Sequence, residues 1–87
     1  MLETGLKVNW SDIKVGEVFA WNGCWIVGLK LSEGRVQVLA RDDTDLAYYN
    51  DTGFIEIEEG CILDVCSTLR HNVYKLPTTT QEFWLTK

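Results

Sequence analysis

Residues 42–64 contain no lysine or arginine. Their eight acidic side chains give this acidic region a formal charge of -8, whereas the whole chain of 87 residues carries -5, so the remainder carries +3. The acidity is therefore local. Two like charges about 10 Å apart in water repel by roughly 0.4 kcal/mol, so such a cluster lowers folding stability unless a cation or a basic partner lies beside it.

Other absences narrow the class of protein. The sequence has no run of about 18 apolar residues, so we expect no membrane-spanning helix, and its first residues lack the basic and apolar segments of a signal peptide. Its three cysteines are an odd number, which argues for reduced thiols and against a disulfide framework. We therefore expect a cytoplasmic protein without membrane contact.

The length and composition are those of one folded unit. Eighty-seven residues, 46% of them hydrophobic, suffice for a single core and not for two. We expect a lead-in over residues 1–10, a folded part over 11–76 and a tail over 77–87, because Pro77 ends the last predicted strand.

Alternating hydrophobicity predicts a three-stranded meander. Residues 17–21 and 24–31 flank Asn22-Gly23, the strongest short hairpin signal, and a turn at 32–34 leads to a third strand over 35–41. A turn before residue 17 precedes the first of these strands. On the third strand the alternation places Val36, Val38 and Ala40 on one side.

Shorter strands are predicted further along the chain. They cover residues 46–50, 54–58, 61–66 and 73–76, with Cys61, Leu63 and Val65 facing inward. A helix over 61–72 is the alternative, since apolar residues there also recur at helical spacing. Five to six of these seven candidate strands, with a helical turn near 67–72 or at the C-terminus, predict an all-β fold that closes into a small barrel.

The segment 12–19, which reads Asp-Ile-Lys-Val-Gly-Glu-Val-Phe, is followed by Asn22-Gly23 and by Trp-Ile-Val at 25–27. This order resembles the opening of many SH3-like barrels, including small proteins of phages and other mobile elements. The resemblance covers residues 12–27 and implies the fold; no functional residue is carried over from it.

The acidic region is the principal candidate site. If Ile55 and Ile57 face inward, period-two alternation places Phe54, Glu56 and Glu58 on the outer face. The full set of expected binding residues is Asp42, Asp43, Asp45, Tyr49, Phe54, Glu56, Glu58 and Asp64. Carboxylates beside an aromatic side chain are typical of a surface that docks on a basic protein, such as the nucleic-acid groove of another protein. We expect a non-enzymatic binding module, with inhibition of a nucleic-acid-handling protein as its sharpest form.

Thiols and an imidazole offer an alternative site. Cys24, Cys61, Cys66 and His71 have the chemistry of a four-ligand zinc site or a small-ligand site, although the spacing of five between the last three residues is not that of a zinc knuckle. We favour no metal and no cofactor.

The aromatic residues suggest a third interpretation, that of a structural subunit. Trp25 is expected in the core, whereas Trp21, Phe83 and Trp84 are candidate interface aromatics for a homo-oligomer. Direct nucleic-acid binding is disfavoured, because the eight basic residues are scattered and the pI is about 4.6.

Overall fold

The structure is a computed structural model that describes residues 5–21, 26–41, 47–50, 53–56 and 58–86, with residues 47–56 described through their backbone. Eleven elements follow one another along these ranges. They are β1 (Leu6–Val8), η1 (Trp10–Asp12), β2 (Val18–Trp21), β3 (Ile26–Ser32), β4 (Arg35–Arg41), β5 (Ala47–Asn50), β6 (Gly53–Glu56), β7 (Ile62–Asp64), α1 (Ser67–Arg70), β8 (Val73–Lys75) and α2 (Thr78–Leu85).

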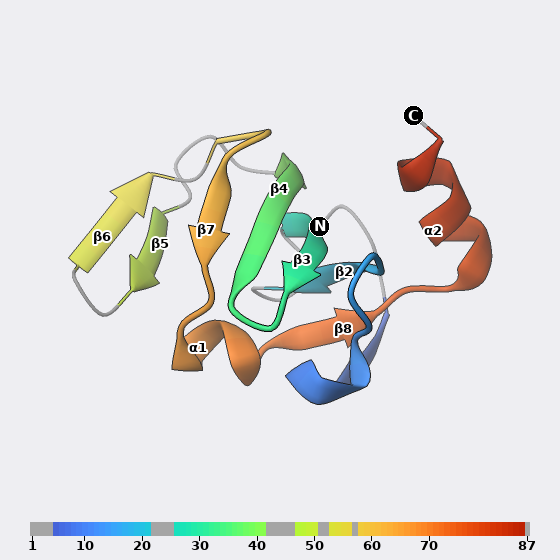
Figure 1. Cartoon of the computed structure of the whole chain (residues 1–87), viewed down its shortest axis with the longest axis horizontal. Helices are drawn as coiled ribbons and strands as arrows, with labels where there is room; N and C mark the ends of the chain where they lie inside the picture. Colours follow the sequence, from blue (N-terminus) through green and yellow to red (C-terminus); the bar gives the residue numbers. More distant parts are fainter. Residues whose placement is uncertain (1–4, 22–25, 42–46, 51–52, 57, 87) are drawn as a thin grey trace.

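Six of the strands form one antiparallel sheet in the order β1-β8-β2-β3-β4-β7 (Figure 1). The all-β prediction is thus confirmed, and so are strands at β7 and β8 with a helical turn between them. The expected closure into a barrel is not observed. Within the described ranges the sheet ends at β1 and β7, each only three residues long, and no strand joins these two edges.

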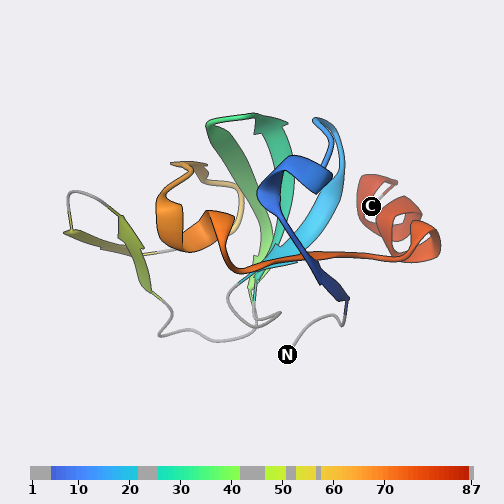
Figure 2. The same cartoon turned by 90° about the horizontal axis from the view of Figure 1, so that it is seen from below.

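The strands β5 and β6 pair with each other and with no other described strand. The sequence predicts them as members of the barrel, and this is where the barrel prediction differs from the structure. The β5–β6 hairpin stands to one side, on the side of β7 in Figure 1 and beyond α1 in Figure 2. A hairpin of two strands has little stability of its own, because it buries little apolar surface.

The meander β2-β3-β4 follows the sequence pattern, but the pairing of β3 with β4 shifts register twice, between Val27 and Gly28 and between Lys30 and Ser32. Val27 pairs with Ala40 and Gly28 with Val38, so Leu39 is an extra residue on β4 and forms a β-bulge. The bulge shifts the alternation by one residue. Val36 and Val38 therefore face one side of the sheet and Ala40 the other, which corrects the prediction that all three share a side.

One face of the sheet carries the larger core cluster. Phe19 meets the ring of Trp10 edge to face at 5.3 Å and stacks on Trp21 at 5.6 Å. Gly28 lies opposite Phe19, and a Cβ at this glycine would come within 2.5 Å of the Trp21 ring. Only glycine fits this position without displacing the ring. The helices η1 and α1 close the cluster, with Leu69 of α1 among its buried members.

The opposite face of the sheet is covered by α2. Small buried residues such as Val18 and Ala20 pack there against the half-buried Trp84 of α2. The expected C-terminal tail therefore folds back as an eight-residue helix that packs on β2. The six-stranded sheet with η1, α1 and α2 is called the body below.

Candidate acidic docking surface

The predicted binding residues, together with Asp51 and Glu59 of the same acidic region, fall into three groups. Asp42, Asp43, Asp45 and Asp51 lie outside the described residues. Tyr49, Phe54 and Glu56 belong to the β5–β6 hairpin, whose backbone alone is described. Glu58, Glu59 and Asp64 are described in full, and all three are exposed.

The turn that carries Glu58 and Glu59 is fixed to the edge of the sheet. Gly60 adopts a φ of 86°, a conformation that favours glycine, and its N–H donates to the Val38 carbonyl of β4 at 2.7 Å. The N–H of Cys61 donates to the Glu58 carbonyl at 3.2 Å. The turn is thus held by its backbone. Neither carboxylate makes an ion pair within the described part of the chain, so both charges face solvent.

Asp64 differs from these two glutamates. Its carboxylate lies 3.5 Å from Nε of Arg35. The side chain of Asp64 is 86% exposed and that of Arg35 is 65% exposed. The register of β4 and β7 places the two residues directly opposite each other. The sequence hypothesis treats all eight acids as unneutralised, and this ion pair corrects it for Asp64. Because both side chains are largely in water, the pair adds little stability.

The hairpin register relates the remaining candidates to one another. Tyr49 pairs with Phe54, and Ala47 with Glu56. Residues opposite each other in an antiparallel pair share a face, and alternate residues of one strand do so too. Tyr49, Phe54 and Glu56 consequently occupy one face of the two-stranded ribbon. The expectation that Ile57 points inward falls outside the described residues.

The thiol and imidazole set is not assembled. Cys66 is buried in the larger core cluster, Cys61 packs against that cluster, and His71 is exposed at the end of α1. Among the described ranges no three His, Cys, Asp or Glu side chains are close enough to hold a metal ion, and Cys24 lies outside those ranges. The buried Cys66 behaves as a small apolar residue.

The candidate interface aromatics occupy different environments. Trp21 is 2% exposed in the core, which overturns its assignment to a surface. The reason is the alternation of β2, which turns Trp21 and Phe19 toward the same covered face. Phe83 is 56% exposed, whereas Trp84 is half-buried between α2 and the sheet. Trp25, the tryptophan expected in the core, is outside the described residues. Trp10 is a buried tryptophan of the larger core cluster.

Sequence reasoning missed a buried lysine. Lys30 of β3 is 1% exposed, and its ammonium donates to the carbonyl oxygens of Ile13 at 2.6 Å and Trp10 at 3.1 Å. It also lies 3.1 Å from the Glu33 carboxylate and 4.2 Å from the centre of the Trp10 ring. These contacts satisfy the charge and tie η1 to β3. No residue pattern marks Lys30 as buried, because its partners come from a turn about 17 residues upstream.

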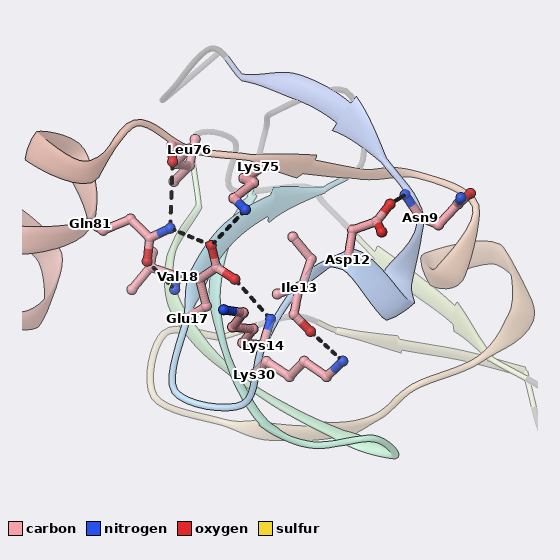
Figure 3. Close-up of polar contacts among 10 residues, drawn as sticks. All are labelled: Asn9, Asp12, Ile13, Lys14, Glu17, Val18, Lys30, Lys75, Leu76 and Gln81. Carbon is pink, nitrogen blue, oxygen red and sulfur yellow. Dashed lines mark hydrogen bonds and ion pairs between the residues drawn. The ribbon is translucent and has the colours of Figure 1, made fainter.

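A second polar network holds α2 against the body (Figure 3). The side chain of Gln81 accepts from the N–H of Val18 at 3.0 Å and donates to Glu17 at 2.9 Å. The same Glu17 carboxylate lies 3.8 Å from the ammonium of Lys75. Glu17 is thereby neutralised within the body, in contrast to Glu58 and Glu59.

An open depression lies where β1 meets the end of α1. It is lined by Lys7, Val8, Asn9, Asp12 and His71. Asp12 is engaged there by the backbone N–H of Asn9 at 3.0 Å. The lining mixes one acid, one cation and one imidazole, so it favours neither an anion nor a metal ion.

Comparisons of the chain with protein-family models, with curated proteins and with solved structures found no match. Within the described ranges, no helix has the length and apolar character needed to cross a membrane.

Proposed function

We propose that this protein is a small binding module that docks on a basic protein surface through its acidic region. The observation that carries the proposal is the pair Glu58 and Glu59, exposed on a turn whose backbone is anchored to β4 and without an ion pair in the described ranges. Charges held in fixed positions at a surface attract and orient a partner of opposite charge.

The rest of the acidic region supports the same function. Glu56 shares a face of the hairpin with Tyr49 and Phe54, which are the types of residue that anchor protein interfaces. Asp42, Asp43 and Asp45 precede the hairpin in the sequence and add to the field. We propose that the partner is a nucleic-acid-handling protein whose phosphate-binding groove is blocked by these carboxylates, and that the module acts without catalysis in the cytoplasm.

The six-stranded antiparallel sheet is compatible with a small barrel-like fold. On the resemblance of residues 12–27 we place it with the SH3-like folds, and a phage or other mobile element is the expected type of source. A domain of 87 residues is large enough to fold without a metal or a disulfide.

The test is affinity capture from the native host with two variants of matched chemistry. Glu59→Lys reverses a charge in the acidic region, and Glu82→Lys makes the same change on the exposed face of α2. We expect a basic protein to be captured by the original chain and by Glu82→Lys, and to be depleted with Glu59→Lys and more so with Glu58→Lys/Glu59→Lys. An equal yield from all four proteins would refute the proposal.

A further inference from the structure

The strand β7 forms one edge of the six-stranded sheet. The carbonyl of Cys61 accepts from Val38, and the N–H of Val65 donates to Gly34, both at 2.9 Å. Because backbone groups of alternate residues point the same way in an antiparallel ladder, those of the intervening Ile62 point away from β4. No hydrogen bond of this N–H or carbonyl to a described residue is observed. Among the described residues, the edge is therefore open at Ile62.

The side chains along β7 suit an added strand. Leu63 is 5% exposed and fixes β7 to the core, whereas Ile62 is 55% exposed on the other face. An exposed isoleucine on an edge strand offers an apolar contact to a neighbouring chain. Short, charged edge strands often serve only to prevent aggregation, so the open edge alone does not identify an occupant.

The charges beside the edge indicate which kind of chain would occupy it. The turn that leads into β7 carries Glu58 and Glu59, which make no ion pair within the described ranges. A second copy of this chain carries the same net charge of -5 and the same acidic region, so its approach to this edge is opposed by like charge. An extended segment with lysine or arginine residues would instead meet opposite charges.

We propose that the edge of β7 takes up an extended, basic segment of the partner as an additional strand. The inference rests on the proposed function and adds its binding mode: main-chain hydrogen bonds to Ile62 set the register, and Glu58 and Glu59 select cationic side chains. Because β7 has only three residues, few main-chain bonds can form, and the charges supply much of the selectivity.

A synthetic peptide of alternating lysine and valine, seven residues long and capped at both ends, serves as the probe. Two control peptides accompany it: one with glutamate in place of lysine, and one N-methylated on alternate residues, which keeps the charge but removes main-chain donors from one edge. We expect the lysine peptide to bind, the N-methylated peptide to bind about three- to tenfold more weakly, and the glutamate peptide not to bind.

The matched protein variants are Ile62→Pro and Ile62→Ala. Proline removes the outward N–H without disturbing the bonds to β4, whereas alanine retains the N–H and removes only side-chain surface. We expect Ile62→Pro to weaken the lysine peptide about three- to tenfold relative to Ile62→Ala. If Ile62→Pro does not fold, the affinity of the N-methylated peptide for the original protein shows whether main-chain hydrogen bonds contribute to binding.

The outcomes separate this inference from the proposed function. If Glu58→Lys/Glu59→Lys abolishes binding of the lysine peptide while Ile62→Pro and N-methylation leave it unchanged, docking is by side chains and strand addition is wrong. If the charge reversal also has no effect, the proposed function falls too. A dimer of the original chain that Ile62→Pro dissociates would show that a second copy occupies the edge, which overturns the inference.

Discussion

The body and the acidic region use charged side chains in opposite ways. In the body, Lys30 is enclosed by two carbonyls and Glu33, and Glu17 is shared between Gln81 and Lys75. In the acidic region, Glu58 and Glu59 meet no cation within the described ranges. These charges of the body therefore stabilise the fold, whereas Glu58 and Glu59 leave their charges exposed.

The two regions also differ in how their strands are supported. The strands β2, β3 and β4 each have neighbours on both sides and bury side chains on both faces of the sheet. Among the described strands, β5 and β6 pair only with each other. Most of the folding free energy should thus come from the body, and the hairpin should tolerate change.

The largest expected effect tests this division of stability. Phe19→Ala removes a fully buried ring that touches Trp10 and Trp21, so unfolding should become easier by about 3–5 kcal/mol. Phe54→Ala makes the same change in β6 and should cost about 1 kcal/mol or less. Urea denaturation of both variants measures the difference. Equal losses would mean that the hairpin belongs to the core and that the comparison fails.

The next effect contrasts two cations. Lys30→Met keeps much of the side-chain volume but removes the ammonium, which leaves the Ile13 carbonyl without this donor and the Trp10 carbonyl with only the N–H of Ile13, at a cost of about 2–4 kcal/mol. Arg35→Met breaks the exposed pair with Asp64 and should change stability by less than about 1 kcal/mol. The stability of both variants is measured from their denaturation midpoints. A similar loss of stability in the two variants would contradict the conclusion that Lys30 stabilises the fold and the Arg35 pair does not.

Packing inside the meander gives a third, smaller effect. A methyl group at Gly28 would meet the Trp21 ring and come within 2.8 Å of Val36, so Gly28→Ala should cost about 1–3 kcal/mol. The control Gly34→Ala places its methyl in open space and should be close to neutral. Thermal unfolding distinguishes them. A neutral Gly28→Ala would show that β2 and β4 pack more loosely than described.

The smallest effect concerns repulsion within the acidic region. Glu59→Lys relieves like-charge contacts and should raise the free energy of unfolding by roughly 0.5 kcal/mol at low salt, a gain that disappears at high salt. The same reversal at Glu82, on the exposed side of α2, should give a smaller gain. Denaturation at two salt concentrations provides the measurement. A stabilisation at Glu82 equal to that at Glu59 would mean that the charge is not concentrated where the sequence places it.

Local features of the fold could be predicted from the sequence. Alternation located β2, β3 and β4, and the inward set Cys61, Leu63 and Val65 is confirmed by its contacts with the larger core cluster. Features that depend on distant partners could not. The bulge at Leu39, the burial of Lys30 and the open edges of the sheet arise from tertiary packing, which no short window of sequence contains.

The candidate site shows the same limit. The exposure of Asp64 follows from period-two alternation on β7, whereas Glu58 is exposed because it lies on the turn after β6 rather than on the predicted strand. The ion pair of Asp64 with Arg35 was not predicted, because it depends on β4 pairing with β7 across 29 residues of chain. The fixed backbone of the turn at Gly60 likewise depends on Val38, which lies far from it in the sequence.

The account is tested most directly by the rate at which the captured partner associates with the protein as salt is varied. If Glu58 and Glu59 steer the encounter, the rate constant should fall steeply with ionic strength for the original chain and for Glu82→Lys. For Glu58→Lys/Glu59→Lys it should be at least about tenfold lower at low salt and nearly independent of salt. Identical rates and identical salt dependence for all three proteins would contradict the proposal that Glu58 and Glu59 steer the partner.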